Sequence, residues 1–328
     1  MSVAGFVVVA LAVTMYVLLD GFDLGVAAVA PFIARGDRER AAAMASIGPF
    51  WNGNEVWLIT AGAALFALFP AAYASSFSGF YLPFIVVLWL LMFRGIALEL
   101  RGHLPSELWH QFWDGAFSCS SGLLIVVFGV ALGNLLRGVP LDAAGYFQGT
   151  FAFLLNPYAL LVGLFALAAL AQHGAAFLAM RVEGAFGQKA ARAVLMLWPV
   201  VLGLYLVMTV LTLRVHLPGG ALWLFVMPVL SLGALLGLRW NATAQPAGWS
   251  FAMSSLFIVT LLAEAAGTLF PYLIPAFPAG HGGISIFSAA PSSVALGCAL
   301  TVTVAGIVMV SIYGPIVWWR MGGTIRVE

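Results

Sequence analysis

Long apolar runs, separated by short charged or Pro- and Gly-rich breaks, dominate this chain of 328 residues. A helix needs roughly 20 apolar residues to cross a hydrocarbon core of about 30 Å. Runs of that length lie at nine positions: residues 4–33, 43–69, 75–100, 113–135, 153–180, 193–214, 220–239, 249–274 and 292–319. No segment shows the alternation over about ten residues that is typical of a membrane barrel, and an open strand would leave its backbone unpaired in lipid. The pattern predicts an all-α polytopic membrane protein with nine transmembrane helices.

The order of these spans suggests how the single transmembrane domain, residues 1–328, is organised. Eight of the spans can form two four-helix bundles, the first within residues 1–140 and the second within residues 141–280. Residues 281–328 would then hold a peripheral ninth helix and the C-terminus. This division rests on the helix count and order alone.

Composition agrees with a membrane protein and excludes several other classes. Hydrophobic residues make up 63% of the chain and charged residues only 8%, against about 25% charged in an ordinary soluble domain. The net charge is +1 and no long basic run occurs, so we expect no nucleic-acid partner. Cys119 and Cys298 lie in apolar runs without metal-ligand spacing, so no metal site is expected. No nucleotide, phosphate or nucleophile motif is present, and we expect no catalytic residue in this chain.

Basic residues are distributed unevenly among the predicted connections. Those after the odd-numbered spans carry Arg35, Arg38, Arg40, Arg101, Arg181, Lys189, Arg192, Arg239, Arg320 and Arg326. The connections after the fourth and sixth spans carry only Arg137 and Arg214. Because cytoplasmic loops are enriched in arginine and lysine, this predicts an N-terminus outside the membrane and a C-terminus in the cytoplasm.

Polar side chains interrupt the first two spans. Asp20 and Asp23 lie in the first, and Asn52, Asn54 and Glu55 lie in the second. A carboxylate at the centre of a lone membrane helix costs roughly 2.5–3.5 kcal/mol, so such groups normally face a bundle interior, a partner or a water path. Asp20 and Glu55 are each about 14 residues, or about 21 Å, from the cytoplasmic ends of their helices.

Two of these polar pairs are spaced three residues apart. Asp20 shares a helix face with Asp23, and Asn52 shares one with Glu55. If the two faces meet, they form a polar cluster in the middle of the membrane that is suited to a proton or water path. The alternative is that these groups only hydrogen-bond to close the packing of the two helices. Physical reasoning from the residues leaves both interpretations open.

Other polar residues in the spans are candidates for structural or subunit-interface positions: Trp51, Trp57, Arg94, Glu99, Arg101, His173 and Glu264. Arg94 and Glu99 are expected near the cytoplasmic interface, where a snorkelling side chain and an ion pair would explain them. For His173 a hydrogen-bonded interior position is favoured over haem ligation, because no second histidine lies at matching depth in another span. Glu264 can pair with another helix or with a partner subunit.

Several motifs, in the same order along nearly the whole chain, resemble subunit II of cytochrome bd-type quinol oxidases. They are Leu19-Asp20-Gly21-Phe22-Asp23-Leu24-Gly25, Gly48-Pro49-Phe50-Trp51-Asn52-Gly53-Asn54-Glu55-Val56-Trp57-Leu58, Phe77-Ser78-Gly79-Phe80-Tyr81, Phe93-Arg94-Gly95, Gly133-Asn134-Leu135-Leu136-Arg137-Gly138-Val139-Pro140, Leu154-Leu155-Asn156-Pro157-Tyr158 and Leu269-Phe270-Pro271.

The resemblance implies a subunit that binds no haem and sits in the bacterial cytoplasmic membrane as two four-helix bundles plus one helix. Its partner, subunit I, would carry two b-type haems, haem d and the quinol site, and the complex would oxidise quinol and reduce oxygen to water. Small single-helix subunits and a structural quinone are further expected components, and membrane lipid surrounds the complex. The resemblance also implies a polar route for protons from the cytoplasm, to which Asp20, Asp23 and the helix 43–69 motif would contribute.

One position departs from the family motif, which reads Trp-Asp-Gly-Asn where this chain has asparagine at position 52. An amide cannot take up and release a proton at physiological pH. Glu55, one turn along, could take that role, or the route could run mainly through subunit I. Two other hypotheses are a stand-alone proton-coupled secondary transporter that uses Asp20, Asp23 and Glu55, and a scaffold in which these acids only hold helices together.

Overall fold

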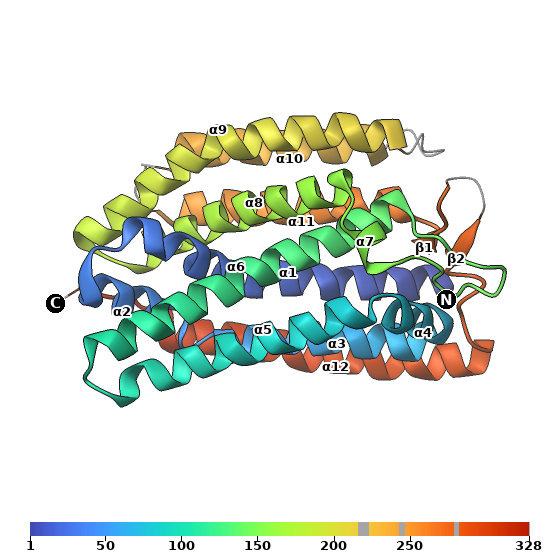
Figure 1. Ribbon diagram of the computed structural model, residues 1–328, viewed down its shortest axis with the longest axis horizontal. Helices are drawn as coiled ribbons and strands as arrows, with labels where there is room; N and C mark the ends of the chain where they lie inside the picture. Colours follow the sequence, from blue (N-terminus) through green and yellow to red (C-terminus); the bar gives the residue numbers. More distant parts are fainter. Residues whose placement is uncertain (216–222, 243–246, 279–281, 328) are drawn as a thin grey trace.

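The computed structural model describes residues 1–215, 223–242, 247–278 and 282–327. Long helices run side by side along the molecule (Figure 1). The helices are α1 (Ser2–Ile33), α2 (Gly36–Ile47), α3 (Trp51–Leu68), α4 (Pro70–Gly79), α5 (Tyr81–Leu100), η1 (Arg101–His103), α6 (Glu107–Arg137), α7 (Phe151–Leu154), α8 (Pro157–Arg181), α9 (Gly184–Val215), α10 (Trp223–Asn241), α11 (Gly248–Leu269) and α12 (Ser293–Met321). The strands are β1 (Tyr272–Pro275) and β2 (Gly283–Ser285).

A helix of at least 18 residues lies in each predicted span. Within the described ranges, seven helices are long and apolar enough to cross a membrane by length and composition, and α3 and α10 are not among them. The polytopic helical class is therefore confirmed, while the count of nine crossings stays a prediction. Residues 220–222 of the seventh predicted span lie outside the described residues.

Four predicted spans are interrupted or end elsewhere in the structure. In the span 153–180 the short α7 ends at Leu154 and α8 begins only at Pro157. The span 43–69 is divided into α2 and α3 by a turn at Gly48-Pro49-Phe50. The span 75–100 is divided into α4 and α5 at Phe80. The span 249–274 was predicted to end too late along the chain, because α11 ends at Leu269 and β1 follows. Proline lacks the N–H that a helix interior needs, which explains why chain breaks fall at Gly48-Pro49 and after Phe270.

Helix α8 lies at the centre of the packing and contacts α1, α6, α9 and α11. Its contact with α1 depends on two glycines, since a Cβ on Gly25 would lie 1.9 Å from the carbonyl oxygen of Leu170, and a Cβ on Gly174 would lie 2.2 Å from the backbone of Gly25. Without a hydrophobic driving force between helices in lipid, small residues that allow close backbone approach favour association. The glycines of α1 and α8 therefore join the first and second halves of the chain.

The outer helices occupy opposite sides of this centre. The pair α9 and α10 forms one edge of the molecule, and α12 lies beside α3 at the other (Figure 1). α12 contacts mainly α3, with a smaller contact to α1, which suits a peripheral ninth helix. The division into two four-helix bundles stays a prediction, because α8 packs against α1 and α6 as well as α9 and α11.

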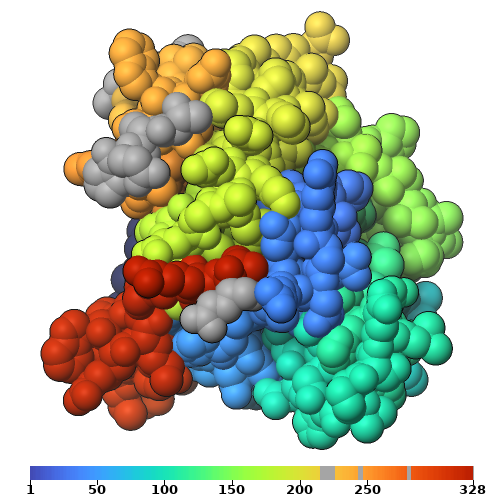
Figure 2. All heavy atoms as spheres, turned by 90° about the vertical axis from the view of Figure 1, so that its left-hand side faces the viewer, coloured from blue at the N-terminus to red at the C-terminus, as the bar shows by residue number. Residues whose placement is uncertain are grey.

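The C-terminal segment folds back onto the end of α8. Ile325 forms a parallel bridge with Val182, and the guanidinium of Arg181 donates to the carbonyl oxygens of Met321 (3.1 Å) and Gly323. Figure 2 shows these last residues, in dark red, lying across the yellow-green surface of the α8–α9 junction. The segment thereby fastens the end of α12 to the rest of the molecule.

A short antiparallel hairpin, β1 and β2, lies at the other end of the molecule, near the N-terminus (Figure 1). Val139, just after α6, bridges to Ala276 beside it. Gly138 makes this possible, because its φ of 89° lies in the left-handed region and a Cβ there would meet the carbonyl oxygen of Ala276 at 2.8 Å. The all-α prediction did not include this hairpin.

Candidate functional site

An ion pair lies fully buried among α1, α3 and α5. The guanidinium of Arg94 on α5 donates to both carboxylate oxygens of Asp20 on α1, Nη1 to Oδ2 at 2.9 Å and Nη2 to Oδ1 in a shorter contact. Arg94 is 1% exposed and Asp20 0%. A two-pronged arginine–carboxylate pair is the strongest common form of charge-assisted hydrogen bond. The pair therefore fixes α5 to α1 inside the apolar region.

Asp23, one turn further along α1, is held on one side only. Its Oδ2 accepts a hydrogen bond of 2.8 Å from Nδ2 of Asn54 on α3 and lies 3.8 Å from Nη2 of Arg94. The same Asn54 amide donates to the backbone oxygen of Leu19 at 3.2 Å. The other carboxylate oxygen of Asp23, Oδ1, is buried without a hydrogen-bond partner in the described chain. One carboxylate oxygen of Asp23 is thus fixed and the other is available.

On α3, Asn54 is the residue that faces the two aspartates. The sequence predicted that Asn52 and Glu55 would face them together, and this was wrong for Asn52. Asn52 is exposed, and Glu55 is half-buried at the margin of the cluster. Asn52 and Asn54 point about 200° apart, because successive helical residues are rotated by about 100°. Glu55 still lies close enough to Arg94 and Asp20 for their charges to interact.

Three buried polar atoms in this cluster have no hydrogen-bond partner within the described residues: Tyr16 Oη, Asp23 Oδ1 and Arg94 Nε. Tyr16 lies on α1 beside Asp20 and is 4% exposed. Most buried polar groups in proteins are hydrogen bonded to protein or to ordered water. An interior with both donors and acceptors to spare is chemically suited to water.

Arg94 corrects an expectation drawn from the sequence, which paired it with Glu99 near the cytoplasmic interface. Glu99 is exposed, and the guanidinium of Arg94 turns inward to Asp20. A snorkelling arginine keeps its guanidinium in water at the membrane surface. Arg94 turns inward because the buried carboxylate of Asp20 offers two charged acceptor oxygens. The inward pair also neutralises Asp20, which otherwise would lie uncompensated in the membrane.

Arg101 belongs to a second charged group at the end of α5, close to α2. Its Nε lies 2.6 Å from Asp114 Oδ1 and its Nη2 lies 2.6 Å from Asp37 Oδ1. His110 Nδ1 is 3.1 Å from the same Asp37 oxygen. Partial burial alone would raise the pKa of Asp37, but Arg101 and His110 outweigh it, so the pKa lies below its ordinary value. This group joins α2, α5 and α6.

The comparison with known proteins decides the family. A family model described as "Cytochrome bd terminal oxidase subunit II" matches residues 1–321. The chain belongs to the cytochrome bd terminal oxidase subunit II family. It is therefore a multi-pass subunit of an oxidoreductase complex of the respiratory chain.

Relatives of this family match over most of their length. Cytochrome bd-I ubiquinol oxidase subunit 2 of Escherichia coli (strain K12) is 34% identical, covering 95% of this chain and 92% of that protein. Probable cytochrome oxidase subunit 2 of Haemophilus influenzae is 32% identical, covering 90% and 87%. The structure of bd oxidase from Geobacillus thermodenitrificans matches with a TM-score of 0.79 at 18% identity, covering 98% of each chain, which shows a shared fold.

In a subunit of a cytochrome oxidase, the interior histidine of α8 has to be tested as a haem ligand. His173 is 0% exposed, its Nε2 lies 3.0 Å from the backbone oxygen of Leu18, and its Nδ1 lies 2.8 Å from Ser254 Oγ. Since a carbonyl oxygen can only accept, Nε2 carries the hydrogen and Nδ1 accepts from the serine. Both nitrogens are engaged, so His173 does not fit a haem iron. Within the described part of the chain, no group of three or more His, Cys, Asp or Glu could hold a metal ion.

The two tryptophans that flank the α3 polar segment lie in different surroundings. Trp57 is 3% exposed and packs with Ala12, Tyr16 and Ile307, next to the ion pair. Trp51 is half-buried beside Gly95, whose Cβ, if present, would lie 3.7 Å from the indole. Trp57 therefore closes the cluster toward α12, and Trp51 covers the contact with α5.

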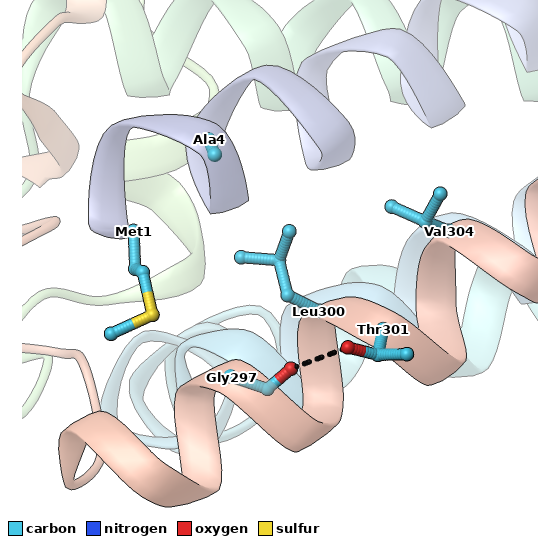
Figure 3. Close-up of a pocket in the computed structure, with 6 residues that line it drawn as sticks. All are labelled: Met1, Ala4, Gly297, Leu300, Thr301 and Val304. Carbon is cyan, nitrogen blue, oxygen red and sulfur yellow. Dashed lines mark hydrogen bonds between the residues drawn. The ribbon is translucent and has the colours of Figure 1, made fainter.

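An open apolar groove of about 510 Å³ lies between the start of α1 and α12 (Figure 3). The residues that line it are Met1, Ala4, Gly297, Leu300, Thr301 and Val304. The hydroxyl of Thr301 donates to the carbonyl oxygen of Gly297 at 3.0 Å, within its own helix. The groove is therefore an apolar surface with few groups that could hydrogen-bond a ligand, and it contains none of the ionisable side chains of the Asp20–Arg94 cluster.

Sequence reasoning missed some members of these sites. Tyr16, Asp37 and Asp114 gave no signal beyond their polarity, and their roles follow from the elements that meet around them. The partners of Glu264, the hydroxyls of Ser231 and Tyr205, were also missed. A signal for Arg94 was available, because a cation inside an apolar span requires an anion on a neighbouring helix.

Proposed function

We propose that this chain is the haem-free subunit II of an oxidase whose subunit I carries two b-type haems, haem d and the quinol site. The complex oxidises quinol and reduces oxygen to water. Family membership along residues 1–321 supports this assignment. The hydrogen bonds of His173 support placing the haems in the partner, because they occupy the deeply buried imidazole of α8.

The chain also lines a path for protons and water beside α1, α3 and α5. The observation that carries this proposal is the buried group of unpartnered polar atoms, Tyr16 Oη, Asp23 Oδ1 and Arg94 Nε. Water that bridges such atoms can pass protons between them. The half-buried Glu55 connects this group to the surface of α3, where the exposed Asn52 shows that the helix face is open in the isolated chain.

The residues of the path have different tasks. Arg94 donates to both carboxylate oxygens of Asp20 and leaves neither free, so Asp20 is an anchor and not a carrier. Asn54 holds Oδ2 of Asp23 and leaves Oδ1 free to accept a proton. Glu55 is the second carboxylate that can exchange protons, and Asn52 contributes hydrogen bonds only. In this chain the carriers are therefore Asp23 and Glu55.

The orientation of the path follows the distribution of basic residues. The ends of α5 and α8 carry Arg101 and Arg181, and α2 beside them carries Arg38 and Arg40. Cytoplasmic ends are enriched in arginine, so we place this end of the molecule in the cytoplasm and the N-terminus outside. Protons then enter from the end at which Asp37, Arg101 and Asp114 lie.

Purification tests the subunit assignment. The tagged chain, extracted in mild detergent, is expected to bring down a partner whose reduced-minus-oxidised spectrum shows haem b and haem d bands. Expression without the partner gene gives the control, in which those bands are absent. A monodisperse, active, haem-free protein would contradict the proposal and favour a stand-alone proton-coupled transporter.

Substitution of the carriers tests the path. In the purified oxidase, the double variant Asp23→Asn/Glu55→Gln is expected to lower oxygen turnover several-fold and to change its pH profile, with the haem spectrum intact. Glu107→Gln is the matched control, because Glu107 is an exposed carboxylate at the start of α6, outside the cluster. Turnover that matches the wild type at every pH in an intact complex would rule out this path.

A further inference from the structure

A second polar network lies apart from the ion pair, between α9, α10 and α11. Oε1 of Glu264 on α11 accepts from the hydroxyl of Tyr205 on α9 at 3.1 Å and makes a shorter contact with Oγ of Ser231 on α10. Ser231 Oγ lies 2.8 Å from Thr260 Oγ1, one turn before Glu264 on α11. Ser231, Tyr205 and Thr260 are all buried, and Glu264 is half-buried. Nothing in the proposed function uses this group.

The hydroxyl hydrogens of this network can be counted. The single hydrogen of Tyr205 is shared between Glu264 and the carbonyl oxygen of Pro228, which lies 3.2 Å away. The hydroxyl of Thr260 lies 2.9 Å from the carbonyl oxygen of Leu256, which can only accept, so the hydrogen of Thr260 is used there. The contact between Ser231 and Thr260 then needs the single hydrogen of Ser231. No hydroxyl hydrogen is left for the short contact between Ser231 and Glu264. A proton on the carboxyl group of Glu264 supplies it and completes a head-to-tail chain that ends at Leu256.

The opposite orientation describes the site without its proton. Thr260 then donates to Ser231, Ser231 and Tyr205 donate to the carboxylate, and the carbonyl oxygen of Leu256 loses the threonine hydrogen. In that state a negative charge lies in the membrane region with two neutral donors, and none of the described residues supplies it with a cation. Uncompensated charge is expensive there, so the protonated state is favoured. One proton therefore reverses the direction of the hydroxyl chain.

We propose that Glu264, Ser231 and Thr260 form a proton-binding site within the membrane, with Glu264 as a neutral carboxylic acid that donates to Ser231. The ligand is a proton, and Tyr205 fixes the orientation of the carboxyl group. Glu264 lies five residues, or about 8 Å, before the end of α11 at Leu269. This places the site toward the end of the molecule that carries the N-terminus (Figure 1).

The site is separate from the Asp20–Arg94 cluster. α9 and α10 form the edge of the molecule opposite to α3 and α12 (Figure 1). Helix α11 packs against α10, α8, α1, α6 and β1. Several ionisable groups on these elements have other partners. Asp20 and Asp23 pair with Arg94, His173 bonds to Leu18 and Ser254, Tyr158 bonds to Thr212, and Arg137 lies over the rings of Phe153 and Phe277. Arg239 lies in the last turn of α10, near Asn241, whereas Glu264 lies near the end of α11. Among the described residues, Tyr205 is the titratable side chain that contacts Glu264.

Infrared spectroscopy of the intact oxidase tests the proposal. The wild-type complex is expected to show a carbonyl band of a protonated carboxylic acid that is lost in Glu264→Gln. With its amide nitrogen in the place of Oε1, the glutamine keeps a donor for Ser231, and Tyr205 can donate instead to the carbonyl oxygen of Pro228, which lies 3.2 Å away. Glu107→Gln is the matched control and is expected to keep the band, since Glu107 is exposed at the start of α6.

Ser231→Ala gives a second test that does not require the Glu264 variant to assemble. Removing the acceptor of the proton is expected to shift the same band, whereas an ionised carboxylate has no such band to shift. Acid bands that are identical in wild type, Glu264→Gln and Ser231→Ala would overturn the proposal. That result would indicate a carboxylate paired with a cation or with a basic group of the partner subunit.

Discussion

The buried ion pair between Asp20 and Arg94 gives the sharpest prediction about stability. Replacing Arg94 with methionine keeps an apolar chain of similar length but leaves the Asp20 carboxylate buried without its two charged donors. Breaking a buried pair by removing one partner costs about 3–5 kcal/mol. At 1.4 kcal/mol for each factor of ten, the folded-to-unfolded ratio should fall roughly 100- to 4,000-fold.

The effect of the partner substitution should be smaller. Asp20→Asn leaves Arg94 with Asp23, whose Oδ2 lies 3.8 Å from Nη2. The double variant Arg94→Met/Asp20→Asn removes both charges, and replacing a whole buried pair with neutral groups is often close to neutral in free energy. We therefore expect the double variant to recover at least half of the loss caused by Arg94→Met.

The loss of stability in each variant is measured by thermal unfolding of the purified complex, followed by circular dichroism and by the haem spectrum. For a chain of this size, 1 kcal/mol corresponds to about 2 °C in Tm, so Arg94→Met should lower Tm by about 6–10 °C. Arg320→Met, at an exposed arginine of α12, is the matched control and should change Tm little. A double variant whose loss equals the sum of the single losses, or an Arg94→Met protein as stable as the Arg320→Met protein, would refute the reasoning.

Three further substitutions test other parts of the structure. Gly174→Ala places a Cβ 2.2 Å from the backbone of α1 and should reduce the yield of assembled complex several-fold, whereas Gly203→Ala, with nothing within 4 Å, should not. Ser254→Ala leaves the interior histidine without one partner and should cost about 1–3 kcal/mol, seen as a lower Tm, while Ser255→Ala on the same helix should be nearly neutral. The lowered pKa of Asp37 means that its contribution to stability is present above pH about 4 and is lost on acidification through the folded-state pKa. Tm measured from about pH 7 to about pH 3.5 should therefore fall less in Asp37→Asn than in wild type. An equal fall in both proteins would contradict this assignment.

Much of the architecture follows from the sequence itself. Apolar runs of membrane length can satisfy their backbone in lipid only as helices, so the polytopic helical class and the approximate spans were predictable. The position of Asp20 and Asp23 inside α1 already indicated that another element must supply a hydrogen-bond donor or a cation to their carboxylates. The turns at Gly48-Pro49 and after Phe270 also have local signals, since proline disfavours a continued helix.

The partners of these side chains depended on the tertiary structure. Lipid tails and helix interiors are equally apolar, so hydropathy does not tell which face of a membrane helix points inward. That is why the sequence left both Asn52 and Asn54 as candidates and placed Asn52 on the face of Glu55, while the fold brought Asn54, about 200° around α3, to the aspartates. The burial of Arg94 against Asp20 and the hydroxyl chain at Glu264 likewise required the rotation and contact of separate helices. The sequence determined which groups lie in the membrane, and only the packing of the helices decided which of them meet.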